Sequence, residues 1–369
     1  MTILYDGFIY ACQAHGGINR YFSEVIGRLP REHRAIVASG APLMSEPPTR
    51  PGLKIRRLRV RDFRPWKLAR ALDSAESWIK TRLPLPDVFH PTYYTPSHRP
   101  MWERWSGPMV VTVWDMIHEL FAAEMDPTGA AAREKLQVIQ RADAIVCISE
   151  NTKNDLMNHV DLADKAVSVC HLASNLTGEM ASGDEPVPDA PYVLYVGTRW
   201  SYKNFECLVR AFAALRSRGV DLRLSLAGPP FTDEESAALS RRDLLRHIDH
   251  WGHVSDTHLA KLYRCARAFV YPSRYEGFGI PVLDAMACGT PVVASNRASI
   301  PEVAGDAAIL FDPDSADELV SVLVALARDE TRRRELIDRG ARRAAEFDWQ
   351  RATGQTLSAY SGAIERHAA

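Results

Sequence analysis

The sequence predicts an α/β protein built from two doubly wound domains, each organised around a parallel sheet. Short apolar runs of strand length alternate with segments of helical periodicity along all 369 residues, which is typical of repeated βαβ units. The pattern restarts at Tyr192–Val196 after Thr177–Pro191, a stretch rich in Gly, Pro, Asp and Ser that is typical of a linker. We therefore expect four parts: an N-terminal domain over 1–176, a linker over 177–190, a C-terminal domain over 191–348 and a last helix over 349–369.

Composition and charge fit a soluble globular enzyme. The net charge of −1 disfavours a strongly electrostatic partner for the whole chain, nucleic acid included. The six cysteines are scattered without a Cys-X-X-Cys pair, which predicts buried, reduced thiols and no zinc site. Asp6 interrupts the N-terminus before any signal-peptide core, and no run approaches the roughly 20 apolar residues of a membrane span. We therefore expect a cytoplasmic protein.

The first half opens with a strand over Thr2–Tyr5, a loop, and then Gly16 and Gly17 ahead of a helix. Apolar residues recur at helical spacing from Ile18 to Leu29, so the glycine pair precedes the helix N-terminus. A phosphate or a sugar could approach the exposed backbone there. A tight turn alone would also explain two glycines.

A second group of polar residues follows the β-branched strand Met109–Val113. Asp115 and His118 come directly after this strand. Doubly wound sheets bind ligands at the carboxyl ends of their strands, so both residues are candidates for the ligand crevice. The alternative for His118 is an ordinary surface pair with Glu119.

Residues 54–82 form a locally basic segment with interleaved aromatic residues and an amphipathic helical pattern. Such a segment could contact an anionic membrane surface. The alternative is a surface helix that packs its apolar face on its own domain.

The second half places a glycine and two cations after its first strand. Gly197 follows Tyr192–Val196, and Arg199 and Lys203 come next, just before a helical pattern that begins near Phe205. Cations fixed at a glycine turn and a helix start are well suited to a diphosphate. We expect Arg199 and Lys203 to bind one.

The densest motif lies within Tyr271–Pro291, which reads as a strand end, a glycine-bearing loop, a short helix and a turn. Gly277 and Gly279 leave backbone N–H groups uncovered just before the helix, an arrangement suited to phosphate. Two carboxylates, Glu276 and Asp284, bracket this backbone. The motif therefore predicts a ligand that carries both phosphate and hydroxyl groups.

This motif resembles the Glu-X7-Glu signature of the retaining, GT-B-fold glycosyltransferases known as family 4. Here it is Glu276-Gly-Phe-Gly-Ile-Pro-Val-Leu-Asp284, so the second acid is an aspartate, shorter than glutamate by one methylene. The segments Asp6-Gly7 and His15–Phe22 are similar to members that assemble polysaccharides. Many relatives have a histidine at the position of Trp114, so the role of that histidine does not transfer to this chain.

The resemblance implies two Rossmann-like domains that face a cleft, an acceptor-binding N-terminal one and a nucleotide-sugar-binding C-terminal one. It also implies a last helix that crosses back onto the first domain, and retention of anomeric configuration. It implies a hexosyltransferase that uses a nucleotide-diphosphate sugar and a glycan or lipid-linked glycan in surface polysaccharide biosynthesis, such as lipopolysaccharide O-antigen. Glu276 would contact the sugar, with Asp115 and His118 as further catalytic candidates, and Asp284 would hold the ribose. No metal and no separate cofactor are expected. The expected donor-site residues are Gly16, Gly17, Arg199, Lys203, His253, Val254, Gly277, Phe278, Gly279, Ile280 and Asp284.

GDP-mannose is the donor we expect first, because Gly16–Tyr21 and Arg199–Asn204 resemble segments of bacterial mannosyltransferases. UDP- and dTDP-sugars stay open as donors. Two other functions also stay open: a nucleotide-sugar epimerase or phosphorylase of the same fold, and a non-catalytic nucleotide-sugar-binding protein. If residues 54–82 contact lipid, the expected location is the inner face of the cytoplasmic membrane.

Overall fold

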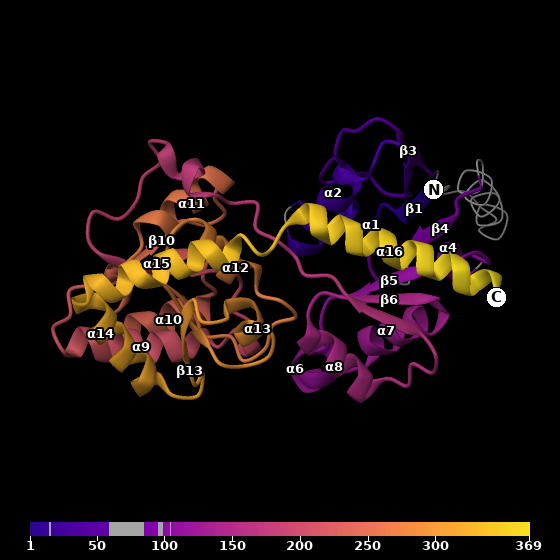
Figure 1. The fold of residues 1–369 in the computed structure, drawn as a ribbon. Helices are drawn as coiled ribbons and strands as arrows, with labels where there is room; N and C mark the ends of the chain where they lie inside the picture. The colour runs from indigo at the N-terminus through magenta and orange to yellow at the C-terminus, as the bar shows by residue number, and fades with distance from the viewer. Residues whose placement is uncertain (15, 59–84, 95–98, 104) are drawn as a thin grey trace. The chain divides into compact units, whose positions relative to one another are not determined.

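The chain forms two compact units in the computed structural model, which describes residues 1–14, 16–58, 85–94, 99–103 and 105–369. The N-terminal unit comprises Met1–Leu172 together with Trp349–Ala369, and the C-terminal unit comprises Ala173–Asp348 (Figure 1). The basic segment 54–82 lies outside the described residues from residue 59 onward, so its contact with a membrane stays a prediction.

All strand pairs of the N-terminal unit are parallel, in the order β3-β2-β1-β4 and then β5-β6-β7. A parallel bridge between Phe89 and Met109 links the two groups. The β-branched run of β5 is buried throughout, as expected of a central parallel strand. The strands are β1 (Thr2–Asp6), β2 (Arg34–Ser39), β3 (Leu53–Arg57), β4 (Val88–His90), β5 (Val110–Val113), β6 (Ala144–Cys147) and β7 (Ala166–Val169).

The helices of this unit connect successive strands. Helix α8 begins where the Ser149 side chain accepts a hydrogen bond from the Thr152 N–H at 2.9 Å, a typical N-cap. The described helices are α1 (Phe8–Cys12), α2 (Gly17–Arg28), α4 (Arg99–Glu103), α5 (Ile117–Leu120), α6 (Ala122–Met125), α7 (Ala130–Arg141), α8 (Glu150–His159) and α16 (Trp349–Ala368).

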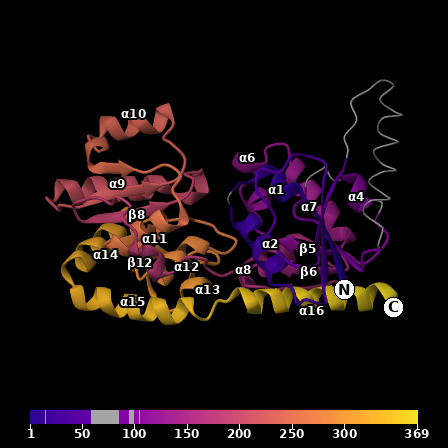
Figure 2. The ribbon, with the colours of Figure 1, turned by 90° about the horizontal axis from the view of Figure 1, so that it is seen from above.

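The last helix, α16, packs on α2 and on strands β4, β5 and β6 of the N-terminal unit. Figure 1 shows it in yellow beside α2, and Figure 2 shows it beneath β5 and β6. The Tyr360 hydroxyl lies 3.0 Å from the Tyr5 hydroxyl and 2.8 Å from His90 Nδ1. The Tyr21 hydroxyl lies 2.9 Å from Thr356 Oγ1. These buried hydrogen bonds fix the position of α16 along the sheet, because a shifted helix would leave them unmade.

The C-terminal unit has one parallel sheet in the order β10-β9-β8-β11-β12-β13. The chain first adds strands on one side of β8 and then, from β11 onward, on the other. The strands are β8 (Tyr192–Val196), β9 (Arg223–Ala227), β10 (Ile248–His250), β11 (Ala268–Tyr271), β12 (Val292–Ser295) and β13 (Ala308–Phe311).

Helices of the C-terminal unit cover this sheet, with α9 and α14 packed against each other and α15 packed on α12. The α-helices are α9 (Phe205–Ser217), α10 (Asp233–Arg241), α11 (Asp256–Cys265), α12 (Ile280–Ala287), α13 (Ile300–Ala304), α14 (Ala316–Arg328) and α15 (Glu330–Ala344). Three 3₁₀ helices are η2 (Gly178–Ser182), η3 (Ser201–Lys203) and η4 (Leu245–His247).

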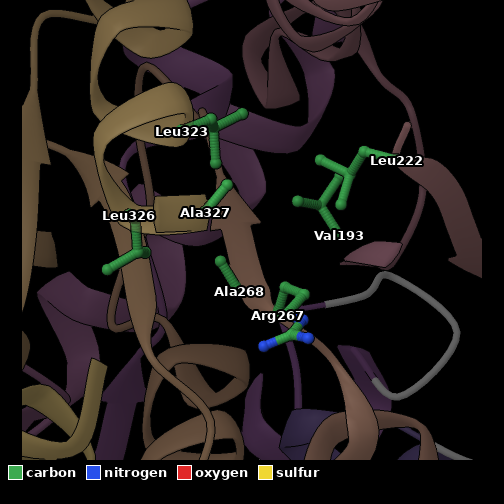
Figure 3. Close-up of a pocket in the computed structure, with 7 residues that line it drawn as sticks. All are labelled: Val193, Leu222, Arg267, Ala268, Leu323, Leu326 and Ala327. Atoms are coloured by element: carbon green, nitrogen blue, oxygen red, sulfur yellow. The ribbon is translucent and has the colours of Figure 1, made fainter. Parts of the chain in front are cut away.

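A small apolar cavity of about 10 Å³ lies in this core (Figure 3). It is bounded by Val193 of β8, Ala268 of β11 and side chains of α14 such as Leu323. Val193 and Ala268 stand at the amino ends of their strands. The cavity is therefore a packing defect away from the carboxyl ends, where parallel sheets bind ligands.

Residues 177–190, expected to be a linker, are part of the C-terminal unit. Helix η2 packs on α11, and His258 Nε2 of α11 lies 2.8 Å from the Pro186 carbonyl oxygen. Composition alone did not reveal this packing, because backbone carbonyls, those of Gly183 and Pro186, accept its hydrogen bonds from α11. Among the described residues, no helix is both long enough and apolar enough to cross a membrane.

Burial of His90 predicts a specific pH dependence of stability. His90 is fully buried, and its desolvation lowers its pKa to about 3. The unfolded chain therefore binds one more proton than the folded chain as pH falls below the ordinary histidine pKa, and stability is lost from about pH 6.5 down to about 3. In denaturant unfolding across pH 7 to 4, His90→Gln should lose about 1.4 kcal/mol less per pH unit than the native protein. Parallel stability curves for the two proteins would contradict this assignment.

Candidate active site

The site lies where the strand order of the C-terminal sheet reverses, between β8 and β11. In doubly wound sheets, loops diverge at such a point and leave a crevice at the carboxyl ends of the strands. Lys203 follows β8 and Glu276 follows β11. Lys203 Nζ lies 2.8 Å from Glu276 Oε1 and 2.9 Å from Oε2, so the structure brings these two predicted residues together. Their side chains are 15% and 9% exposed.

Tyrosine rings surround the ammonium group of this pair. Lys203 Nζ lies 5.2 Å from the centre of the Tyr202 ring and 5.7 Å from that of Tyr271, within the range of cation–π attraction. Burial, reinforced by the charge of Glu276, raises the pKa of Tyr271 well above its ordinary value. The Tyr271 phenol therefore stays neutral and leaves Lys203 and Glu276 as the charged groups here.

Hydrogen bonds from Ser299 fix the loop that carries Glu276. Its hydroxyl, fully buried, lies 2.8 Å from both the Glu276 and the Phe278 carbonyl oxygens. Gly279 then adopts φ 104° and precedes Ile280, the first residue of α12. Glycine is suited to this left-handed conformation and brings no side chain to the helix N-terminus. The amides that start α12 are thereby oriented toward the same strand edge as Lys203, as anion binding requires.

Arg199 follows β8, and its guanidinium is bound within the C-terminal unit, so its expected contact with a diphosphate stays a prediction. Arg199 Nε donates to Glu235 Oε1 at 2.7 Å, and the two terminal nitrogens donate to the carbonyls of Pro229 and Pro230 at 2.9 and 2.7 Å. The guanidinium also stacks 4.8 Å from the Phe231 ring. Burial alone would raise the pKa of Glu235, but the bonds from Arg199 and from a backbone N–H hold it below its ordinary value. Arg199 therefore anchors the loop after β8.

Asp284 is buried in α12 and 5% exposed. The Ser174 hydroxyl donates to Asp284 Oδ1 at 2.6 Å. Sequence reasoning missed Ser174, because it lies 110 residues away and no motif surrounds it. Its hydroxyl reaches the shorter aspartate side chain and orients the carboxylate expected to bind ribose.

A glycine with positive φ follows each of the neighbouring strands β8, β9 and β10. These glycines are Gly197, Gly228 and Gly252. The Gly197 N–H donates to the Ala227 carbonyl oxygen at 2.9 Å, and the Gly228 N–H donates to the Gly252 carbonyl oxygen at 2.9 Å. A Cβ on Gly228 would stand 2.4 Å from the Gly197 carbonyl oxygen, so this backbone packs more closely than any side chain permits. The expected donor-site residues His253, which is exposed, and Val254, half-buried, follow at the same edge.

In the N-terminal unit, Gly16 and Gly17 are exposed at the start of α2, as expected. Asp115 follows β5 and accepts the Ile117 N–H at 3.1 Å. The buried Lys135 ammonium donates to Glu119 Oε2 at 2.7 Å and to the Asp115 carbonyl at 2.9 Å. Glu119 therefore pairs with Lys135. Half-buried His118 keeps a buried Nδ1 without a hydrogen-bond partner among the described residues.

Trp114 is a core residue, 5% exposed. Its ring packs edge-on against Tyr21 and Phe22 of α2, with ring centres 5.1 and 5.9 Å apart. The side chain thus joins β5 to the helix after β1. This packing explains why tryptophan suits a position where the resemblance suggested histidine.

Asp6 is a buried acid that the sequence analysis named within a family segment but did not count among the site residues. It ends β1, and its Oδ1 accepts the Thr92 N–H at 3.1 Å and the Thr92 hydroxyl. Asp6 Oδ2 is buried with no hydrogen-bond partner among the described residues. A polar residue that closes an apolar strand was the available signal, since β1 and β4 flank the point where this sheet also reverses its order.

Comparisons with known proteins agree with this fold. A family model described as Glycosyltransferase Family 4 matches residues 15–176, and one described as Glycosyl transferases group 1 matches residues 182–343. The chain is similar to the O-antigen chain mannosyltransferase B of Escherichia coli, with 38% identity over 176 residues, 46% of this chain and 45% of that protein. The match thus spans less than half of that relative's length.

Two further proteins match most of the chain. A D-inositol 3-phosphate glycosyltransferase of Geodermatophilus obscurus is 28% identical over 402 residues, covering 96% of this chain and 86% of that protein. The solved structure of sucrose-phosphate synthase from Thermosynechococcus elongatus superposes with a TM-score of 0.78 at 20% identity, over 98% of both chains. This second likeness shows the fold alone.

The two parallel-sheet units and these matches show that the chain is a GT-B glycosyltransferase. The two family models together match nearly all of the chain, which belongs to glycosyltransferase family 4.

If Arg199 anchors its loop, replacing its guanidinium group should lower the stability of the protein. Arg199→Lys should lower the unfolding free energy by about 2 kcal/mol, because a lysine cannot replace hydrogen bonds to two carbonyls and a carboxylate. Arg242→Lys is a matched control, since Arg242 makes a two-nitrogen pair with Glu206 but is 38% exposed. Its loss should stay within about 0.5 kcal/mol in the same denaturant titration. Equal losses for the two variants would contradict the anchoring role.

Proposed function

We propose that the chain is a retaining glycosyltransferase that moves a hexose from a nucleotide-diphosphate sugar to a glycan or lipid-linked glycan. The observation that carries this proposal is the contact between Lys203 and Glu276 at the strand-order reversal of the C-terminal sheet. A diphosphate needs a fixed cation, and a transferring sugar needs a carboxylate beside its ring. Both groups stand together at the start of α12.

Lys203 is suited to the charge that develops on the leaving diphosphate. Its ammonium group is largely buried, so its attraction for a phosphate is little screened by water. The amides of Gly277–Ile280 and the positive end of α12 add further stabilisation. We therefore propose a diphosphate held by Lys203 and these amides, with no metal required and no separate cofactor.

Glu276 is suited to the other half of the reaction. When Lys203 contacts phosphate, the Glu276 carboxylate can accept hydrogen bonds from sugar hydroxyls and stabilise positive charge on the ring. We propose a front-face transfer: the bond from the anomeric carbon to the phosphate oxygen breaks while the acceptor oxygen bonds to that carbon. The departing phosphate oxygen takes the acceptor proton, so no protein nucleophile is needed and the configuration is retained.

GDP-mannose is the donor we propose first. The similarity to the Escherichia coli O-antigen chain mannosyltransferase B supports mannose as the sugar. Asp284, oriented by Ser174, would accept hydrogen bonds from both ribose hydroxyls. An acceptor in surface polysaccharide biosynthesis fits the same relative, and six free thiols are compatible with the cytoplasm. The match to a D-inositol 3-phosphate glycosyltransferase favours a small phosphorylated acceptor as the second candidate.

A nucleotide panel tests the donor. A ligand that binds only the folded state raises the unfolding free energy by about 2.7 kcal/mol at a hundred times its Kd. Thermal unfolding should therefore shift upward by several degrees with GDP, and less with UDP, dTDP or ADP at equal concentration. A larger increase of the unfolding temperature with UDP or dTDP than with GDP would contradict guanine as the base. It would still be compatible with the proposed glycosyltransferase.

Substitutions separate the two charges of the site. Lys203→Ala should weaken GDP binding about 30-fold, as expected for losing charge-assisted hydrogen bonds. Glu276→Gln should bind GDP within about threefold of the native protein but lower the rate of mannosyl transfer on the order of 100-fold. Lys261→Ala is the control, because its ammonium group bonds to the Gly183 carbonyl elsewhere in the C-terminal unit. Full transfer by either site variant would overturn the proposed function.

Product analysis distinguishes the two alternatives. Incubation with GDP-mannose and no acceptor would convert the sugar if the protein were an epimerase. Nucleotide binding with no turnover across glycan acceptors would indicate a non-catalytic binding protein.

A further inference from the structure

Trp200 is an aromatic side chain left in solvent. It is 56% exposed and is the only exposed tryptophan, tyrosine or phenylalanine among the described residues. Tryptophan is large and apolar, and folded chains usually bury most of its surface. An exposed indole on an ordered loop therefore indicates a surface that meets a ligand.

The loop around Trp200 is held in place on both sides. Arg199, directly before it, is bound to Glu235 and to two proline carbonyls. Buried Tyr202 follows, and its carbonyl accepts the Arg274 N–H at 2.7 Å. Since the residues on both sides are fixed, the fold holds the backbone of Trp200 in place while its side chain stays 56% exposed.

The indole is presented at the edge of the sheet that carries the proposed transfer site. Trp200 is the residue before η3, and its carbonyl accepts the Lys203 N–H at 2.8 Å. Lys203 in turn contacts Glu276. The backbone of Trp200 therefore lies one 3₁₀ turn along the chain from Lys203, a member of the pair that would hold the diphosphate and the transferred sugar.

We propose that Trp200 is a stacking platform for a pyranose ring of the acceptor glycan, an inference that rests on the proposed function. The apolar face of a pyranose, with its row of C–H groups, matches the flat, electron-rich face of an indole. The donor-site groups Lys203, Glu276 and Asp284 are largely buried. The exposed Trp200 instead suits a ligand that arrives from solvent and leaves as product.

An acceptor fragment tests this assignment without requiring turnover. By calorimetry, α-linked mannotriose should bind the native protein, and Trp200→Phe should keep that affinity within about threefold because a flat ring remains. Trp200→Ala should bind mannotriose about tenfold more weakly, as expected from losing one aromatic contact. GDP affinity should be unchanged in all three proteins. In steady-state transfer, Trp200→Ala should raise the acceptor KM and leave kcat within about twofold.

Leu245→Ala is the matched control. Leu245 is also apolar and 40% exposed, but it precedes β10 and so lies at the amino end of the same sheet. Absence of mannotriose binding to the native protein, or equal binding by Trp200→Ala, would overturn the platform. If Trp200→Ala weakened GDP binding and left mannotriose binding unchanged, the indole would instead contact the nucleobase. That result would also overturn the proposal that it stacks on the acceptor. Failure of the native protein to bind any nucleotide would instead contradict the proposed function, whatever mannotriose does.

Discussion

The reversal of strand order between β8 and β11 is the constraint on which the rest of the C-terminal unit depends. Adjacent parallel strands whose following loops run in opposite directions leave an opening at their carboxyl ends. The chain fills this opening with one cation and one carboxylate, Lys203 and Glu276. Burying either charge without a partner would cost desolvation free energy. The two charges therefore offset each other until a bound ligand replaces this contact.

Contacts of neighbouring residues hold this pair in position. Asn204 donates to the Pro272 carbonyl at 3.1 Å and to the Pro313 carbonyl at 2.7 Å, which ties the loop after β8 to the loop after β11. The Ser299 hydroxyl bonds to two carbonyls of the second loop. Arg199 ties the first loop to α10. A site whose loops are fixed before the ligand arrives spends less of its binding energy on ordering them.

Sequence reasoning predicted the fold and named Lys203 and Glu276 as site residues, because both depend on local patterns, but it did not predict their contact. Alternating apolar runs indicate parallel strands, and Lys203 and Glu276 each lie a few residues past a strand end. Ser174 and Glu235 could not be predicted, because each meets its partner, Asp284 or Arg199, only after folding brings distant segments together. Arg199 shows most clearly that sequence does not reveal the partner of a charged side chain. A cation beside a glycine turn has the same sequence signal whether it binds phosphate or anchors its own loop.

Hydrogen exchange with and without GDP tests the central claim most directly, since it locates the bound nucleotide along the chain. We propose that the donor binds at the reversal between β8 and β11, so GDP should slow amide exchange in Gly197–Lys203 and in Glu276–Ile280 together. Strands of the N-terminal sheet such as β2 should not change. Protection confined to the N-terminal unit, or absent from both loops at saturating GDP, would contradict the account.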